Sequence, residues 1–173
     1  MLDATRFIYC PRCGKTDIEV YKVKGMRCTE CGYIYFHNTA AAVAGIIEID
    51  GGVLLTVRAQ NPGRGLFDLP GGFADYNESI ETALQREIHE ELGIDVELRA
   101  YLGSFPNTYV FRRVEYFTSD AVFVCSAAVS IQAISCSPEI ERCEVVAADN
   151  LPFDGFAFPS AAAALRKYCE RRG

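Results

Sequence analysis

Residues 69–94 read LPGGFADYNESIETALQREIHEELGI, which is the most informative stretch of the chain. Between Ser79 and Leu92 the apolar residues recur at spacings of three and four, which predicts an amphipathic helix. Asn77 is the expected N-cap of this helix and Gly93 its expected stop. The stretch therefore predicts a helix that is entered from a glycine-containing turn.

Three carboxylates share one face of the predicted helix. Glu87, Glu90 and Glu91 lie at positions i, i+3 and i+4, within a single turn. Like charges at this spacing repel each other, and the C-terminal end of a helix is itself negative. A divalent cation would offset both penalties, and oxygen ligands favour Mg²⁺ or Mn²⁺. Gly71 and Gly72 let the backbone approach an ion or a phosphate closely. A solvated acidic surface is the alternative interpretation.

Four cysteines near the N-terminus form a second pattern. Two CxxC pairs, Cys10-Pro11-Arg12-Cys13 and Cys28-Thr29-Glu30-Cys31, are separated by 14 residues. Four thiolates around one ion predict a closed, tetrahedral Zn²⁺ site that leaves no position for a substrate. Iron, or unrelated buried thiols, are the alternatives. The remaining cysteines have no repeated spacing.

The charge of the chain changes near residue 38. Residues 1–38 carry a net charge of +2 and the rest −8, within a total of −6. A segment of 38 residues is too short to build a sufficient hydrophobic core unaided, so we expect a structural zinc ion to stabilise its fold. We predict a zinc ribbon over residues 1–38 and a larger domain over residues 39–173. Whether the ribbon also binds a partner stays open.

The larger domain alternates strand-type runs with helices. Asp50-Gly51-Gly52 predicts a hairpin turn, and a second helix is expected from Ser160 to about Glu170. Mixed elements of this kind favour an α/β layer fold. Strands are expected at residues 42–49, 53–58, 96–102, 109–111, 114–118, 121–125 and 143–146.

Composition excludes several classes of protein. The 173 residues are 50% hydrophobic and 23% charged, which is typical of a globular protein. The longest apolar run, residues 40–47, is far shorter than the roughly 20 residues of a transmembrane helix, so we expect no membrane association. Residues 1–6 lack the pattern of a secretory signal, which favours a cytoplasmic location. The net charge of −6 disfavours general nucleic-acid binding, although local patches can differ.

The helix and its entry together resemble a known family signature. Gly72 is followed after five residues by Glu78, and after seven more by Arg86-Glu87-Ile88-x-Glu90-Glu91-x-Gly93-Ile94. This pattern resembles the complete Nudix box of the Nudix hydrolase superfamily. The resemblance implies an α/β/α sandwich with a mixed sheet. It also implies hydrolysis of a nucleoside diphosphate linked to another moiety.

The resemblance also implies roles for individual residues. Glu90 and Glu91 would bind Mg²⁺ or Mn²⁺, with Glu87 as a further ligand or as the base. The carbonyl of Gly71 or Gly72 would assist. Arg86 and Glu78 would form an ion pair that orients this cluster. Glu139 stands where many relatives have a loop glutamate and is the candidate general base; a plain surface glutamate is the alternative.

A zinc ribbon before such a domain resembles the NADH pyrophosphatase branch, which implies a substrate such as NADH, ADP-ribose or FAD. The branch has a tryptophan-containing signature after the box; this chain has no tryptophan and reads GSFPNTYVF at residues 103–111. Phe105, Tyr109 and Phe111 are expected to stack on a base, and Arg112 or Arg113 to contact a phosphate, unless the aromatic rings fill the core. One alternative function is removal of a nucleotide cap from RNA, with the ribbon as the nucleic-acid contact. Another is that of a non-catalytic nucleotide sensor. A homodimer is also expected, because related hydrolases often form one.

Overall fold

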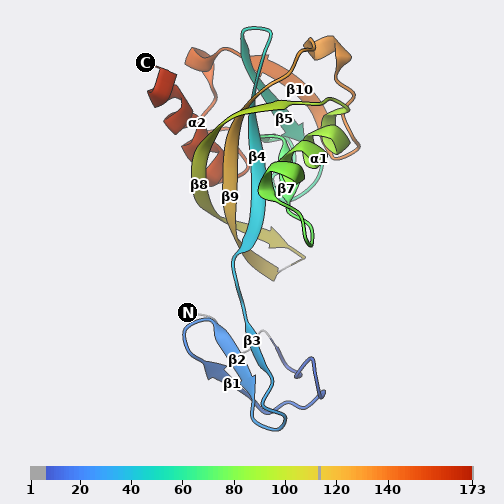
Figure 1. Ribbon diagram of the computed structural model, residues 1–173, viewed down its shortest axis with the longest axis vertical. Helices are drawn as coiled ribbons and strands as arrows, with labels where there is room; N and C mark the ends of the chain where they lie inside the picture. The colour runs from blue at the N-terminus through green and yellow to red at the C-terminus, as the bar shows by residue number, and fades with distance from the viewer. Residues whose placement is uncertain (1–6, 113, 173) are drawn as a thin grey trace. The chain divides into compact units, whose positions relative to one another are not determined.

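The computed structural model describes residues 7–112 and 114–172, which fall into two compact units that divide between Thr39 and Ala40 (Figure 1). Residues 1–6, on which the expected lack of a secretory signal rests, lie outside the described part. The N-terminal unit contains one antiparallel sheet with the strand order β1-β2-β3. Its strands are β1 (Ile18–Tyr21), β2 (Gly25–Cys28) and β3 (Ile34–Phe36).

The second unit is built on a seven-stranded mixed sheet. Its main order is β10-β5-β4-β9-β8, in which β4 and β9 run parallel and the other neighbours antiparallel. Two short strands lie off this path, since β6 pairs with β5 and β7 pairs with β4. The strands are β4 (Ala40–Ile49), β5 (Gly52–Arg58), β6 (Phe67–Asp68), β7 (Gly71–Phe73), β8 (Glu97–Phe111), β9 (Val114–Ser126) and β10 (Ile140–Val146).

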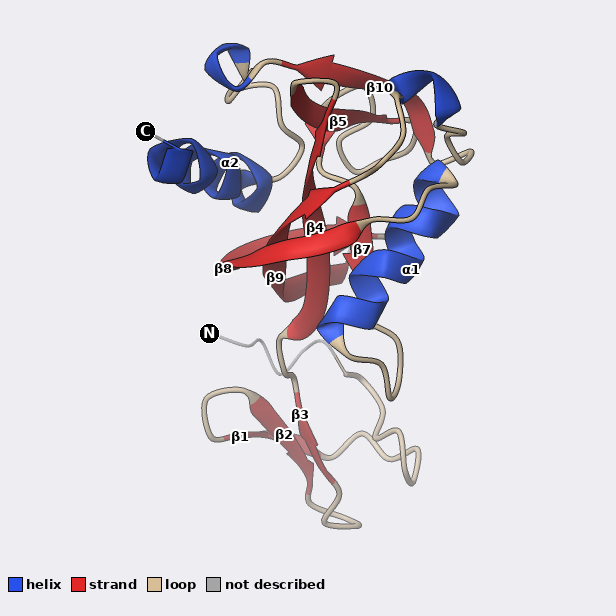
Figure 2. Ribbon diagram, turned by 45° about the horizontal axis from the view of Figure 1, so that its top comes forward, coloured by secondary structure: helices blue, strands red, loops and turns tan. Residues whose placement is uncertain are grey.

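Helices lie on both sides of this sheet (Figure 2). They are α1 (Ile80–Leu92) and α2 (Pro159–Arg172), together with the short 3₁₀ helices η2 (Ile131–Ala133) and η3 (Ala148–Asn150). No helix within residues 7–112 and 114–172 has the length and apolar character to cross a lipid bilayer.

Two hydrophobic clusters, one on each face of the sheet, hold the helices in place. Because successive strand residues point to opposite faces, Ile47 packs with Leu84 and Ile88 of α1, whereas Ile46 packs with Leu165 of α2. All of these side chains are fully buried. The sheet therefore lies between two helical layers, which confirms the expected α/β/α sandwich.

Two strands are longer than the sequence predicts. The runs expected at residues 96–102 and 109–111 form one strand, β8, which continues through Pro106. Proline interrupts the sequence pattern, but β8 is the last strand in the sheet order, where a residue without an N–H group is tolerated. The runs at 114–118 and 121–125 likewise join as β9, because both β4 and β8 pair with the residues between them.

The N-cap of α1 differs from the prediction. Ser79 has extended backbone angles, and its hydroxyl oxygen accepts a hydrogen bond from the Thr82 N–H at 3.2 Å. Asn77 instead has a left-handed φ of 61°, a conformation that asparagine tolerates better than most residues, so its prediction as the cap was wrong. The predicted stop is confirmed, since Gly93 adopts φ 67° and its N–H donates to the His89 carbonyl oxygen.

Loss of the cap hydroxyl should destabilise the second unit. We expect Ser79→Ala to lower the free energy of unfolding by about 1 kcal/mol, because the Thr82 N–H loses its partner. Asn77→Gly is the matched control, and a change below about 0.5 kcal/mol is expected because glycine accepts a positive φ. Urea denaturation of the two variants checks this. Equal losses in both would contradict the assignment of the cap.

Candidate active site

The turn before α1 brings its backbone against the acidic face of the helix. Gly71 and Gly72 lie on β7, where they pair with Ala44 and Val43 of β4. A Cβ atom on Gly71 would overlap the Val43 carbonyl oxygen, and one on Gly72 would lie 2.5 Å from the Glu87 carboxyl carbon. Backbone atoms therefore exclude a side chain at Gly71, whereas one at Gly72 would have to displace the Glu87 carboxylate, which lies directly against the backbone of β7.

The Arg86 guanidinium organises the carboxylates around it. It donates to both carboxylate oxygens of Glu78, at 2.9 and 3.0 Å, and to Glu87 at 2.9 Å. Further hydrogen bonds reach Glu90 at 3.2 Å and the Phe73 carbonyl oxygen at 3.1 Å. These contacts occupy every N–H donor of the arginine. Arg86 accordingly lowers the pKa of Glu78, which also accepts a hydrogen bond from the Asp75 N–H.

Glu91 lies deeper than the other carboxylates of α1. One of its oxygens accepts a hydrogen bond from the Gly71 N–H at 3.0 Å. Burial nevertheless raises the pKa of Glu91 to about 8, and the neighbouring charges of Asp68, Glu87 and Glu139 act in the same direction. Burial raises the pKa of Glu87 as well, although Arg86 opposes it. The carboxylates of α1 thus carry more negative charge than Arg86 offsets, and this donor set fits a hard divalent cation.

A pocket of about 220 Å³ opens beside Glu91. Of the residues predicted from sequence, Glu139, Tyr109 and Phe111 line it with Glu91. Tyr109 also lines an adjacent pocket of about 100 Å³, which includes Gly71 and Gly72. The Tyr109 ring lies 5.6 Å from the ring of Phe73, 5.8 Å from that of Phe158 and 6.4 Å from that of Phe111. An aromatic cluster therefore adjoins the carboxylates.

Two predicted substrate residues do not line either pocket. Phe105 packs on the core cluster beneath α2, with the Lys167 ammonium 5.6 Å from its ring. Arg112 lies in the turn between β8 and β9, with its guanidinium 5.3 Å from the Phe111 ring. Arg113 lies outside the described residues.

Sequence reasoning missed a second set of polar residues in these pockets. The Arg58 guanidinium donates to the Asp68 carboxylate at 2.7 Å, and both side chains line both pockets. In the smaller pocket, the Thr118 hydroxyl donates to the Asp120 carboxylate at 2.5 Å. None of these residues belongs to a recognised motif. The available signal was Asp68 itself, an acidic residue inside the apolar run that precedes Pro70.

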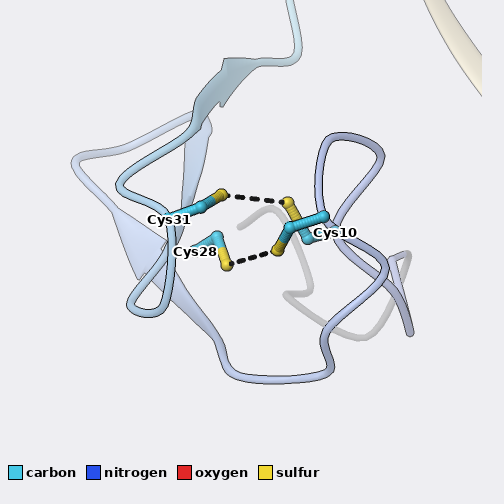
Figure 3. Close-up of side chains that lie close together, drawn as sticks. Cys10, Cys28 and Cys31 are labelled. Atoms are coloured by element: carbon cyan, nitrogen blue, oxygen red, sulfur yellow. Dashed lines mark hydrogen bonds between the residues drawn. The ribbon is translucent and has the colours of Figure 1, made fainter.

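The four ribbon cysteines converge in the N-terminal unit. Their sulfur atoms lie within 4.8 Å of one another, with Cys10 and Cys31 separated by 3.7 Å and Cys13 and Cys28 by 3.6 Å (Figure 3). A tetrahedron with Zn–S bonds of about 2.3 Å separates its sulfur atoms by about 3.8 Å, so the cluster fits Zn²⁺. Each CxxC pair is followed directly by a glycine with φ near 70°. The Gly14 N–H donates to the Cys10 carbonyl oxygen, and the Gly32 N–H donates to that of Cys28.

Comparison with known proteins identifies the family. The model of the NUDIX domain matches residues 36–168, so the chain belongs to the Nudix family. A NUDIX hydrolase structure from Nitrosomonas europaea superposes with a TM-score of 0.76 at 24% identity, over 95% of this chain and 91% of that one. This neighbour shows the fold alone.

Two curated relatives match parts of the chain. An ADP-ribose pyrophosphatase of Methanocaldococcus jannaschii is 46% identical over 72 residues, 42% of each protein. An NAD-capped RNA hydrolase NudC of Haemophilus influenzae is 27% identical over 114 residues, 65% of this chain and 43% of that protein. The chain thus spans less than half the length of these relatives.

Zinc content tests the cysteine cluster. We expect metal analysis to return about one zinc per chain, and Cys31→Ser to lower zinc retention during dialysis against a chelator. Cys169→Ser, which removes a thiol from α2, should retain the metal like the wild type. A folded, reduced ribbon without metal would contradict the assignment.

Buried charge at Glu91 should cost stability when magnesium is absent. A carboxyl group whose pKa rises from 4.5 to about 8 on folding destabilises the folded state increasingly as the pH rises between these values. Glu91→Gln keeps an oxygen for the Gly71 N–H but carries no charge. We therefore expect this variant to be about 1 to 2 kcal/mol more stable than wild type at pH 8 in magnesium-free buffer, and to lose the advantage near pH 4.

Glu90→Gln is the matched control, because the Glu90 side chain is 59% exposed. Urea denaturation at both pH values, with and without magnesium, measures the effect. A wild type that is more stable than Glu91→Gln at pH 8 without magnesium would contradict the account.

Proposed function

We propose that this protein hydrolyses the diphosphate bond of a nucleoside diphosphate linked to another moiety, using Mg²⁺ or Mn²⁺. The observation that supports this most directly is the set of carboxylates on α1, which Arg86 orders against the glycines of β7. A diphosphate repels an anionic nucleophile, so its hydrolysis requires positive charge close to the phosphate oxygens. In this proposal, residues 1–38 are a structural zinc ribbon and residues 39–173 the hydrolase domain.

The proposed roles follow the position of each side chain. Glu90 and Glu91 would hold the catalytic ions with Glu87, assisted by the carbonyl of Gly71 or Gly72. The ions, when bound, would neutralise phosphate oxygens and lower the pKa of the attacking water. Arg86 and Glu78 would act as positioning residues, because they contact the other carboxylates of the cluster or its loop.

Glu139 is the proposed general base. It lines the same pocket as Glu91 but follows η2, so it approaches the ion ligands from a different element. The hydrogen bond between Ser137 N–H and the Glu91 carbonyl oxygen, at 2.8 Å, ties its loop to α1. Glu87 is less suited to accept a proton, since Arg86 already donates to it.

The proposed substrates are dinucleotides or nucleotide sugars such as NADH, ADP-ribose or FAD. Tyr109 and Phe111 line the pocket beside Glu91 and offer aromatic surface to a base, while Arg58 supplies a cation. The relative named as an ADP-ribose pyrophosphatase supports this class. Cytoplasmic location and a homodimer stay predictions. An intact carboxylate cluster argues against the non-catalytic sensor.

RNA cap removal is the second candidate function. Within the ribbon, the Lys22 ammonium and the Arg27 guanidinium lie 5.3 and 5.7 Å from the Tyr21 ring. An aromatic ring close to two cations suits contact with a nucleic acid, because bases stack on rings and phosphates pair with cations. The relative named as an NAD-capped RNA hydrolase supports this candidate.

An assay of product release tests the proposal. NADH, NAD, ADP-ribose, FAD, dinucleoside polyphosphates, nucleoside triphosphates and NAD-capped RNA are each offered with magnesium or manganese. We expect Glu90→Gln to lower the turnover of the preferred substrate about 100-fold or more while the protein stays folded. Glu81→Gln, on the exposed first turn of the same helix, is the matched control and should be fully active.

Full activity in Glu90→Gln would refute the proposed ligand set. Cleavage of capped RNA in preference to all free nucleotides, with binding that weakens steeply as salt rises, would favour the second candidate. A flat salt profile would count against it.

A further inference from the structure

Two cysteines outside the ribbon lie next to each other beside the candidate active site. The sulfur atoms of Cys136 and Cys143 are 2.8 Å apart. Cys136 is exposed in the loop after η2, and Cys143 is half-buried on β10. Cys125, by contrast, is fully buried in the core beneath α1. The pair therefore combines mutual proximity with access from solvent.

Backbone hydrogen bonds position both thiols. The Ser135 N–H donates to the Leu92 carbonyl oxygen at 3.0 Å, and the Ser137 N–H to that of Glu91 at 2.8 Å. These bonds hold the residues on either side of Cys136 to the end of α1. Cys143 lies opposite Thr56 in the pairing of β10 with β5. Little rearrangement is thus needed to bring the two sulfur atoms to bonding distance.

We propose that Cys136 and Cys143 are a redox modification site at which a hydroperoxide forms a reversible disulfide. In the first step the Cys136 sulfur takes one oxygen from the hydroperoxide, which leaves as an alcohol or water, and becomes a sulfenic acid. The Cys143 sulfur then attacks the Cys136 sulfur and expels the oxygen as water. Two thiols and one hydroperoxide thus give one disulfide, one water and one alcohol. A dithiol reverses the reaction by thiol–disulfide exchange.

The disulfide would close a short loop of the chain that contains the proposed general base. Glu139 lies between the two cysteines in sequence, and its carbonyl oxygen accepts a hydrogen bond from the Ala59 N–H at 2.9 Å. Both Glu139 and Thr56, the partner of Cys143, line the pocket that contains Glu91. Oxidation would therefore restrict the loop that forms one wall of this pocket. Formation of the bond does not depend on the proposed activity.

Peptide mapping of the zinc-loaded full chain tests the site. Trypsin cleaves after Arg142 and so places the two cysteines on different peptides, which only a disulfide can join. After treatment with hydrogen peroxide we expect the joined pair, and we expect dithiothreitol to release it. Cys136→Ser should abolish the joined pair, whereas Cys169→Ser should leave its yield unchanged. Because Cys125 shares the tryptic peptide of Cys136, the Cys136→Ser variant also identifies the sulfur that reacts.

Hydrogen exchange provides a readout that is independent of catalysis. Oxidation should slow the exchange of the Ser135 and Ser137 amides in the wild type and leave them unchanged in Cys143→Ser. Oxidation of Cys136 to a sulfinic acid at the same rate in the wild type and in Cys143→Ser, with no joined peptide, would overturn the proposal. A joined peptide without slower exchange would overturn the restriction of the loop.

Discussion

The contact between the Glu87 carboxylate and the backbone of Gly72 is the constraint on which the site depends. A Cβ atom on Gly72 would lie 2.5 Å from the carboxyl carbon of Glu87, so a larger residue there would displace this carboxylate. The contact also draws Arg86 into the cluster, because this guanidinium donates to Glu87 and to the Phe73 carbonyl of the same short strand. Helix, turn and strand are thus joined through one charged network, and the acidic face of α1 cannot shift without breaking hydrogen bonds of Arg86.

The sheet supplies the rigid frame for this network. The parallel pairing of β4 with β9 places β4 at the centre of the strand order, with β7 alongside it. Residues of β4 alternate between the two core clusters, so one strand anchors both α1 and α2. Glu87 and Glu91 each follow a fully buried residue of α1, Leu84 and Ile88, by three positions, so they lie at the border of the buried side of the helix. Packing therefore fixes the positions of the charges.

Local patterns in the sequence predicted the fold and part of the candidate site. The 3.6-residue period predicted α1, and the spacing of the cysteine pairs predicted the sulfur cluster. Both patterns involve residues that lie close together in the sequence. The continuity of β8 through Pro106 depends on its edge position, which no local pattern encodes. The same holds for the ion pair of Arg58 with Asp68, which pairing of β5 with β6 creates. The placement of Phe105 against α2, away from the pockets, likewise follows from tertiary packing.

The balance of charge in the site explains why its stability and its proposed function oppose each other. Burial raises the pKa of Glu91 and of Glu87. Holding these carboxylates close together in their charged form therefore lowers the free energy of unfolding. Arg86 reduces this penalty but already uses every N–H donor on its neighbours. Arg58 lines the same pocket as Glu91 but pairs with Asp68. The carboxylates are therefore left incompletely neutralised, which is what the proposed cation site requires. A bound divalent cation would offset the electrostatic cost of this cluster and would thereby link ion affinity to the stability of the fold.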